Sequence, residues 1–373
     1  MISLEWVKDY IDISDQDLEE LAVKITQSGI NVEKVITNHI NNLVIGEVLE
    51  CVAHPDSDHL HVCKVNVGNT TEQIVCGAPN VREGLKVIVA LPGAVLPGDF
   101  EIKKSKIRGV ESNGMLCALY ELGLEEKNDE TYAKGIEELG TDASVGEDPL
   151  KYLGLDDTLY ELDIHKHRNN DCYYHIGFAY EIGAILNRPV TLPDLSFKED
   201  QNNVENYFTL DVETEKCPFY LAKMVKNAKI GESPEFIKKR LLAAGMRPIN
   251  NVVDISNYVM LEFGQPLHFF DKNRLGNHIL VRDAKDKEEV ITLDGKRRIL
   301  SSNDIVITDG NRPVCIAGVM GGENTEVEQD TTDILIEAAI FDPVSIRYTA
   351  ANLDLRSEAS IRYGKGLSYE YTE

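Results

Sequence analysis

Short β-rich runs separated by turn signals fill the stretch between residues 39 and 151, and this pattern limits the possible folds most. The runs are residues 44–49, 61–67, 73–76 and 86–91. The turns between them are rich in Gly, Pro and Asn, as at Gly77-Ala78-Pro79-Asn80. Several short strands at regular spacing favour a small β-barrel over a βαβ sheet.

The segments on either side of this stretch have helical patterns. Ser14 and Asp17 have the spacing of a capping box, apolar residues on one helical face follow them, and Gly29 ends that helix. A second apolar stripe runs from Ile176 to Leu186, and the polar residues 198–206 suggest a linker. Because both flanking segments are helical, they are expected to form one small domain into which the barrel is inserted.

Beyond the linker the pattern is mixed. Strand-like runs occur at 208–212, 304–307 and 334–336, and a helix is expected from Pro234 to Ala244. The sequence therefore predicts an α+β multidomain protein. The predicted domains are residues 1–38 with 152–200, a small helical or α+β domain; 39–151, a small β-barrel; and 205–373, an α+β domain.

The charge of the chain restricts its partners. With 63 acidic and 38 basic residues, the formal net charge is -25, which excludes a broad electrostatic grip on nucleic acid. The seven cysteines include no C-x-x-C pair, so a disulfide framework or structural zinc site is not expected. With no apolar window near the ~20 residues of a membrane span and no signal-peptide pattern, a cytoplasmic location is expected.

One local cluster departs from this acidic composition. Lys103, Lys104, Lys106 and Arg108 place four cations in six positions. Barrels of this kind can present such residues to an RNA backbone. The alternative is a solvated charged strand with no partner.

Two motif blocks in this stretch resemble a known family. They are His54-Pro55-Asp56-Ser57-Asp58-His59-Leu60, continued by Cys63-Lys64-Val65 and Val75–Asn80, and the later run Lys103–Met115. They are similar to the oligonucleotide-binding barrel of bacterial phenylalanyl-tRNA synthetase beta subunits and of stand-alone tRNA-binding proteins, so the resemblance implies that residues 39–151 form such a barrel. The resemblance implies that tRNA, specifically tRNA-Phe, is the partner, and that the basic cluster contacts it; neither DNA nor a membrane is expected as a partner.

Three later blocks resemble the editing domain of the same subunits. They are Gly245–Tyr258 with Leu261–His268, Cys315–Glu323 and Ile336–Pro343. The resemblance implies a pocket for a misattached tyrosine, with Glu337 accepting a hydrogen bond from the tyrosine hydroxyl. The other implied pocket residues are Arg247, Ser256, Asn257, Pro266 and His268, with Ala317 and Gly318 as the floor.

The implied reaction is hydrolysis of an aminoacyl ester on tRNA. No G-x-S-x-G elbow or Cys–His arrangement suggests a covalent intermediate. A positioned water, oriented by His268 and Asn257, is therefore expected, with Arg247 holding the RNA end. Backbone donors near Ala317 and Gly318 would face the developing oxyanion. No metal or cofactor is expected for editing, since the ATP and Mg of a full synthetase would act in regions outside these residues.

Several of these residues could instead have purely structural roles. Arg247 could cap the preceding helix, His268 could be a core histidine, and Gly321-Gly322 could be only a tight turn. Glu337 stands in the apolar run Ile336–Ala339, where a lone carboxyl is harder to explain structurally. A non-catalytic tRNA-binding module with a decayed pocket is the alternative function.

The sequence departs from the family pattern at two places. His165-Lys166-His167 replaces the usual Thr-Pro-Asn, and Gly364 stands where relatives usually have Glu. His165, His167, Cys172 and His175 raise the alternative of a metal site, against which their irregular spacing argues. The resemblance also implies an alpha-subunit partner, reached through domains that these 373 residues do not include.

Overall fold

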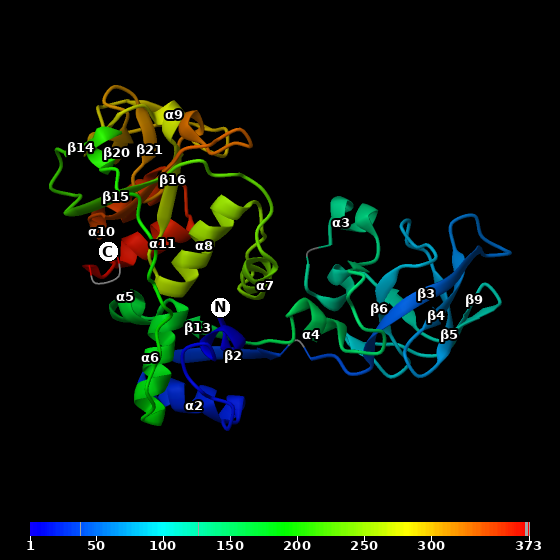
Figure 1. Ribbon diagram of the computed structural model, residues 1–373. Helices are drawn as coiled ribbons and strands as arrows, with labels where there is room; N and C mark the ends of the chain where they lie inside the picture. The colour runs from blue at the N-terminus through cyan, green and yellow to red at the C-terminus, as the bar shows by residue number, and fades with distance from the viewer. Residues whose placement is uncertain (38, 126, 370–371, 373) are drawn as a thin grey trace. The chain divides into compact units, whose positions relative to one another are not determined.

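The computed structural model describes residues 1–37, 39–125, 127–369 and 372. Their contacts define two compact units (Figure 1). We call Thr37–Asp157 the inserted unit, and Met1–Ile36 with Thr158–Glu373 the main unit. The predicted boundary near residues 200–205 lies inside the main unit. Division of the main unit into separate N-terminal and C-terminal domains stays a prediction.

The inserted unit is built on a curled six-stranded antiparallel sheet in the order β11-β6-β3-β4-β5, with β12 added to β6. The strands are β3 (Leu43–Ala53), β4 (His61–Asn66), β5 (Thr71–Cys76), β6 (Lys86–Ala90), β11 (Met115–Cys117) and β12 (Glu138–Leu139). Four of them coincide with the four β-rich runs, so these strand predictions are confirmed.

The curl of this sheet brings its two edges toward each other. The Asn113 N–H, just before β11, donates to the Gln73 carbonyl of β5 at 2.8 Å. The Val75 N–H of β5 donates to Ser112 Oγ at 3.0 Å. Gly46 of β3 suits the curl, because a Cβ there would lie only 2.5 Å from a Val89 methyl group. The sheet therefore resembles a half-barrel, and a complete oligonucleotide-binding barrel stays a proposal.

Smaller elements complete the inserted unit. They are β7 (Val95–Leu96), β8 (Phe100–Glu101), β9 (Ser105–Ile107), β10 (Val110–Ser112), η1 (Leu119–Leu122), α3 (Asp129–Lys134) and α4 (Pro149–Leu153). The strands β9 and β10 form a hairpin, and β7 and β8 form a second two-stranded ribbon.

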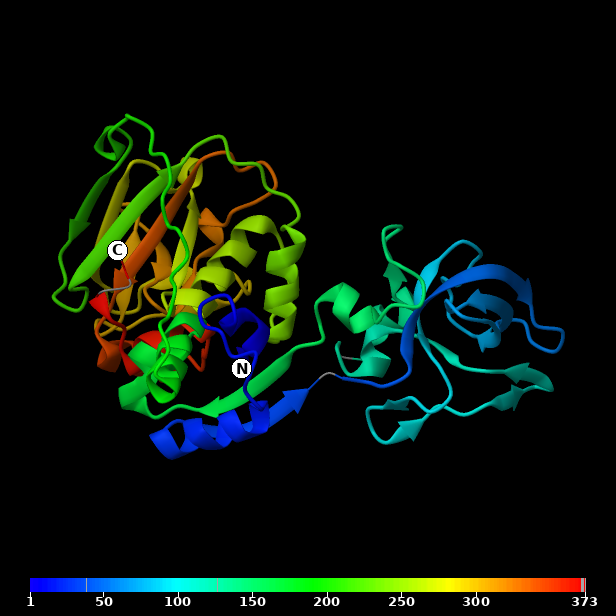
Figure 2. The same cartoon turned by 60° about the horizontal axis from the view of Figure 1, so that its bottom comes forward.

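The N-terminal part of the main unit contains a sheet as well as helices. Its elements are β1 (Ile2–Ser3), α1 (Leu4–Val7), α2 (Leu18–Ser28), β2 (Asn31–Thr37), β13 (Thr158–Asp163), η2 (Lys166–Arg168), α5 (Asn169–Cys172) and α6 (His175–Leu186). The strand order is β1-β13-β2. In Figure 2 the blue β2 and the green β13 lie side by side. The helix is confirmed as α2, but its N-cap is Asp17, which accepts the Glu20 N–H. The predicted capping box between Ser14 and Asp17 does not form, because the Ser14 hydroxyl donates to Asp12 instead.

The helical description of residues 1–38 and 152–200 was incomplete, because it missed these three strands. The reason is physical: β2 has no buried residue and β1 has only two residues. Neither therefore displays the alternation of apolar and polar residues that marks a half-buried strand.

Two sheets form the C-terminal part of the main unit. One has the order β14-β17-β20-β21-β22, and the other has the order β15-β23-β16. The strands are β14 (Thr209–Val212), β15 (Phe219–Val225), β16 (Leu267–Asp271), β17 (His278–Asp283), β18 (Glu289–Ile291), β19 (Arg297–Ile299), β20 (Ile305–Thr308), β21 (Pro313–Ile316), β22 (Met320–Gly321) and β23 (Ile334–Ile340). The helices are η3 (Val204–Asn206), α7 (Glu235–Ala243), α8 (Asn251–Phe263), α9 (Lys272–Leu275), η4 (Glu323–Thr325), α10 (Pro343–Asn352) and α11 (Glu358–Lys365).

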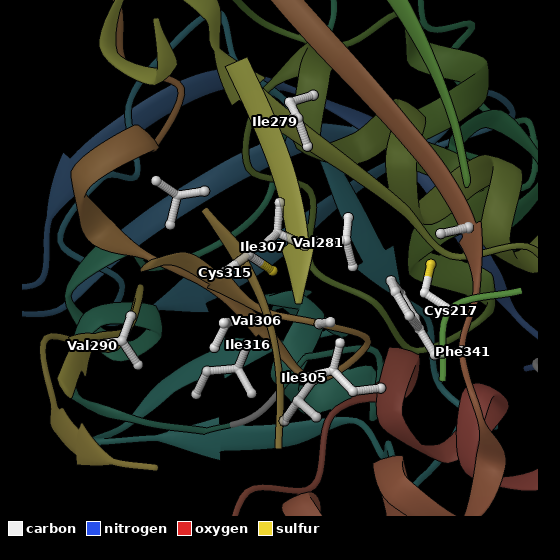
Figure 3. Close-up of a cluster of buried hydrophobic side chains, with 14 of the residues drawn as sticks. Cys217, Ile279, Val281, Val290, Ile305, Val306, Ile307, Cys315, Ile316 and Phe341 are labelled. Carbon is white, nitrogen blue, oxygen red and sulfur yellow. The ribbon is translucent and has the colours of Figure 1, made fainter. Parts of the chain in front are cut away.

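Two hydrophobic clusters hold the main unit together. One takes side chains from both C-terminal sheets, including Val281, Ile307 and Phe341, as Figure 3 shows. The other joins the N-terminal helices to α7 and α8, through Leu241 and Leu261 among others. None of the helices in the described ranges is both long and apolar enough to cross a bilayer.

The close packing of α6 around Gly177 predicts that a larger residue there destabilises the protein. A Cβ at Gly177 would lie 1.8 Å from the Asp171 carbonyl oxygen, so the backbone would have to move. An alanine in a helix interior usually stabilises by about 0.5–1 kcal/mol relative to glycine. Here we expect Gly177→Ala to lower the thermal midpoint instead, measured by circular dichroism. Gly231→Ala is the control, since no atom lies within 4 Å of its new methyl group; equal midpoints for both variants would contradict the prediction.

Candidate functional site

A pocket of about 280 Å³ opens in the main unit between α8, β16, the β21–β22 turn, β23 and the start of α11. Its size is near the lower end of ligand pockets, which span roughly 300–1,000 Å³. The lining residues are Ser256, Asn257, Met260, Pro266, Leu267, His268, Leu293, Cys315, Gly318, Val319, Met320, Gly321, Glu337, Ser357, Glu358, Ala359 and Tyr363. Six of the eight residues predicted for the pocket are among them.

Glu337 is the unusual group in this pocket. It lies on β23, is only 3% exposed, and its Oε2 has no hydrogen-bond partner among the described residues. Burial raises the pKa of Glu337 to about 8, against the opposite effect of the nearby Tyr220 hydroxyl. A carboxyl held in this way is mostly protonated at neutral pH, and it can both donate and accept a hydrogen bond.

His268 lies opposite Glu337 in the β16–β23 pairing. Residues paired across antiparallel strands point to the same face, so both side chains face the pocket. The His268 ring is half-buried, and its crowded surroundings lower its pKa to about 4 through desolvation. The ring is therefore neutral at pH 7. Gly321 makes room for it, because a Cβ at 321 would lie 2.4 Å from Cε1 of His268.

Helix α8 supplies Ser256 and Asn257 to the pocket wall. Asn250 caps this helix by accepting the N–H groups of Val252 and Val253. The Ser256 hydroxyl donates to the Leu267 carbonyl at 2.9 Å, which fixes α8 to β16. Asn257 is half-buried and lines the cavity, where its amide can meet a polar ligand.

A buried glutamine, Gln265, supports the far wall. Its Nε2 donates to the carbonyls of Pro266 and Ala339 at 3.0 and 3.1 Å, and to the Tyr363 hydroxyl at 3.3 Å. Gln265 thereby connects β16, β23 and α11. The sequence analysis did not single out Gln265 or Tyr363. The available signal was an uncharged polar residue next to Pro266 within the Phe263–His268 block.

Two predicted residues are not brought to the pocket. Arg247 is exposed in the connection between α7 and α8 and is not a lining residue. Ala317 is 1% exposed in the core, and its N–H donates to the Ile305 carbonyl at 3.0 Å. The Ala317 N–H is therefore not available as a donor to a ligand. Gly318 does line the pocket, with φ +67° and a Cβ position 3.0 Å from Phe341 and Ile346 atoms.

A larger hollow of about 680 Å³ lies between residues 197–207 and strand β15. Its charged members, such as Lys223 and Glu199, are well exposed and pair with each other at 3.0 Å. It offers no buried unpaired group comparable with Glu337. We therefore place the candidate site in the smaller pocket.

The basic cluster of the inserted unit surrounds the β9–β10 hairpin. The two turn residues, Arg108 and Gly109, have φ +46° and +86°, which is characteristic of a type I′ turn. The Arg108 guanidinium donates to the Asp56 carbonyl at 2.8 Å. Buried His54 accepts the Asp56 N–H at Nδ1, so its Nε2–H donates to the Ile107 carbonyl at 3.1 Å. The two motif blocks of the sequence therefore meet at this hairpin.

The lysines of this cluster are exposed. Lys103 pairs with Glu101 at 2.7 Å and Lys106 with Glu111 at 3.7 Å, at 70% and 67% side-chain exposure. No ion pair involves Lys104 in the part of the chain that the structure describes. Because exposed ion pairs contribute only about 0–1 kcal/mol, these lysines can exchange a carboxylate for a phosphate at little cost.

The metal alternative is not supported at His175. Its Nε2 accepts the Ser3 N–H at 3.1 Å and its Nδ1 meets the Leu261 carbonyl at 2.8 Å, so both ring nitrogens are occupied. No group of three metal-ligating side chains occurs among residues 1–37, 39–125, 127–369 and 372. His165 and His167 stack at 5.8 Å, and the Lys166 side chain between them lies outside the described part.

Gly364, which departs from the family pattern, packs closely against a neighbouring helix. A Cβ at Gly364 would lie 2.9 Å from Cγ of Arg347 on α10. Glycine therefore lets the Arg347 stem pack directly on α11, where a larger residue would displace it.

Comparison with known proteins finds two family domains in the chain. Residues 43–142 match the family model "Putative tRNA binding domain", and residues 216–373 match "B3/4 domain". The phenylalanine–tRNA ligase beta subunit of Geobacillus kaustophilus is 49% identical over 373 residues, covering 98% of this chain and 46% of that protein. That of Bacillus cereus (strain ZK / E33L) is 48% identical over 372 residues, with the same coverage. The chain thus spans about half the length of the curated relatives it matches.

Among solved structures, an N-terminal fragment of the phenylalanyl-tRNA synthetase beta subunit from Pyrococcus horikoshii is similar at 14% identity and a TM-score of 0.30. That match covers 56% of this chain and 62% of the fragment.

The two matched domains, together in one chain, define a component of an aminoacyl-tRNA synthetase. The relatives, which match nearly the whole chain, make the family specific. The chain belongs to the family of phenylalanine–tRNA ligase beta subunits.

The raised pKa of Glu337 predicts that the difference in unfolding free energy between wild type and Glu337→Gln changes with pH. Between pH 4.5 and about 8 the unfolded state loses this proton while the folded state keeps it, so wild-type stability falls as pH rises. Glu337→Gln cannot titrate. Its unfolding free energy should therefore rise relative to wild type through this window, by at most about 1.4 kcal/mol per pH unit.

Urea unfolding at pH 5, 6, 7 and 8 measures this difference. Glu326→Gln, at an exposed site on the same unit, should track the wild type throughout. A constant difference between Glu337→Gln and wild type across the series would show that the buried carboxyl titrates normally.

Proposed function

We propose that this chain binds tRNA through the inserted unit and hydrolyses tyrosine wrongly attached to tRNA-Phe in the pocket of the main unit. The observation that carries the proposal is the unpaired, buried carboxyl of Glu337 in a cavity sized for one amino-acid side chain. The relatives are ligases for phenylalanine, and tyrosine differs from phenylalanine by one hydroxyl. The resemblance of residues 245–343 to an editing domain supports the same reaction.

Selectivity would come from hydrogen bonding rather than from size. A tyrosine hydroxyl can pair with the free Oε2 of Glu337. Phenylalanine would leave that buried group unpaired, which costs about 1–3 kcal/mol. A site built to bind a hydroxyl rejects the analogue that lacks it far better than a hydrophobic pocket rejects an added group.

Hydrolysis would use a positioned water. The neutral His268 ring can orient a water molecule, and Asn257 can supply a second polar contact. A covalent route is disfavoured, because burial raises the pKa of the Cys315 thiol well above its usual range. Ser256 is unsuited as a nucleophile, since its hydroxyl donates to the Leu267 carbonyl. No cofactor is needed in this scheme.

Arg247 can still act outside the pocket. It is exposed in the α7–α8 connection, where holding the RNA end remains its proposed role. The other proposed partner is an alpha subunit, and the proposed location is the cytoplasm. The second candidate function, tRNA binding without hydrolysis, is favoured by the placement of Arg247 and Ala317 away from the pocket.

Deacylation kinetics test the pocket. Wild-type protein should release tyrosine from Tyr-tRNA(Phe) and spare Phe-tRNA(Phe). Glu337→Ala should lose this preference, by roughly tenfold or more for one buried hydrogen bond to the substrate. Glu337→Gln should retain much of it, because an amide can also donate and accept. Glu326→Ala serves as the exposed control, and equal hydrolysis of both substrates by wild type would refute the proposal.

Filter binding of tRNA-Phe tests the basic cluster. Charge reversal at Lys104 and Arg108 should weaken binding roughly tenfold and reduce the slope of affinity against salt by about two, since two phosphate contacts are lost. Lys104→Glu alone leaves the Arg108 turn intact. Lys151→Glu changes the charge equally on another exposed surface of the inserted unit and should have little effect. Unchanged binding in both cluster variants would exclude the hairpin as the RNA platform.

A further inference from the structure

A second group of cations lies in the main unit, around the ring of Tyr173. Arg362 and Lys365, both on α11, place their charged groups 4.6 and 4.8 Å from the centre of this ring. Arg356 precedes α11, and its charge also acts on Tyr173 and Lys365. We call Arg356, Arg362, Lys365 and Tyr173 the α11 patch.

The charges of the α11 patch are incompletely balanced. Arg362 is 2% exposed, pairs with Glu358 at 2.6 Å, and leaves its Nε without a partner among the described residues. Within the same limits, no ion pair involves Arg356 or Lys365. Burial lowers the pKa of Lys365, as do Arg362 and Arg356, while Asp163 and Glu358 oppose them. An added anion would therefore be stabilised here.

Other groups facing the patch do not remove this excess. The N-terminal amine of Met1 is a further positive charge near Arg362, and its pKa is lowered by burial and by Arg362. The acidic Glu161 near this amine already pairs with Lys34 at 2.8 Å. A local cationic surface is notable on a chain with a formal net charge of -25.

The α11 patch adjoins the mouth of the pocket. Ser357, Glu358 and Ala359 line the pocket, and Arg356 is the preceding residue, with consecutive α-carbons about 3.8 Å apart. The Ser357 hydroxyl donates to the Val319 carbonyl at 2.7 Å, which ties the start of α11 to the β21–β22 turn. Because Arg356 and α11 contribute residues to both surfaces, one ligand can contact them together.

We propose that the α11 patch binds backbone phosphates of the single-stranded 3′ end of tRNA and so guides the terminal aminoacyl ester into the pocket. This inference rests on the proposed function. Arg356 is exposed and Lys365 half-buried, so both can contact phosphate. Arg362 is buried, and its positive charge attracts the phosphate without contacting it. The shared start of α11 suits this partner, since the amino acid and the adjoining phosphates belong to one RNA strand.

The test is binding of an uncharged acceptor-stem minihelix, with and without its unpaired CCA tail, measured by fluorescence anisotropy on the full chain. Arg356→Glu should weaken binding of the tailed RNA roughly tenfold and lower its salt dependence by about one. Binding of the blunt RNA should stay unchanged. Lys365→Gln should act in the same direction.

Arg347→Glu is the matched control. It also removes an exposed cation of the main unit, but it contacts α11 at Gly364, away from the Tyr173 side of the helix. An equal loss in Arg347→Glu, or unchanged binding of the tailed RNA in Arg356→Glu, would overturn the inference. So would equal losses for tailed and blunt RNA.

The outcome is separable from that of the proposed function, because uncharged RNA binds without hydrolysis. Suppose that wild type fails to deacylate Tyr-tRNA(Phe) while Arg356→Glu still binds the tailed RNA more weakly than wild type does. The proposed phosphate binding by the α11 patch is then supported, and the proposed hydrolysis is refuted. If hydrolysis occurs, Arg356→Glu should raise KM with little change in kcat, as expected for lost ground-state binding. A change confined to kcat would count against the patch.

Discussion

The pairing of β16 with β23 is the interaction on which the candidate site depends. Its register sets His268 opposite Glu337, and β15 pairs with the other edge of β23, placing Ala222 beside the carboxyl. A slip of one residue would turn both side chains to the other face of the sheet. The desolvation that raises the pKa of Glu337 arises from this enclosure. The carboxyl therefore stays protonated at neutral pH only while the three strands remain paired.

Hydrogen bonds to backbone carbonyls hold the surrounding walls on that pairing. Ser256 joins α8 to β16, Gln265 joins the start of β16 to β23, and Ser357 joins α11 to the β21–β22 turn. Each of these polar side chains contacts backbone instead of a ligand. The groups left free to meet a substrate are consequently few, with Glu337, His268 and Asn257 foremost among them.

The sequence predicted the parts of the structure that depend on local patterns or long motifs. The strands of the inserted unit follow from β-rich runs between turns, and α2 follows from its apolar face and from Gly29 at its end. The strands β1, β2 and β13 were missed. β1 has only two residues and β2 has no buried residue, while β13 buries the adjacent residues Leu159 and Tyr160 and so does not alternate. Motif resemblance supplied pocket residues from three blocks but not Gln265 or Tyr363, whose contacts are tertiary. Arg247 and Ala317 are not among the lining residues, and position within a motif does not reveal which side chains turn inward.

The location of the inserted unit between β2 and β13 has a consequence for the order of folding. These strands pair in the sheet of the main unit, yet the whole segment Thr37–Asp157 separates them along the chain. The entropy lost on closing a flexible loop grows with its length, by about 0.6 kcal/mol per doubling. If the inserted unit folds first, its own core shortens the effective tether between the strands. Folding of the inserted unit would then speed folding of the main unit. A variant whose inserted unit is unfolded would pair β2 with β13 more slowly, although that unit adds no strand to their sheet.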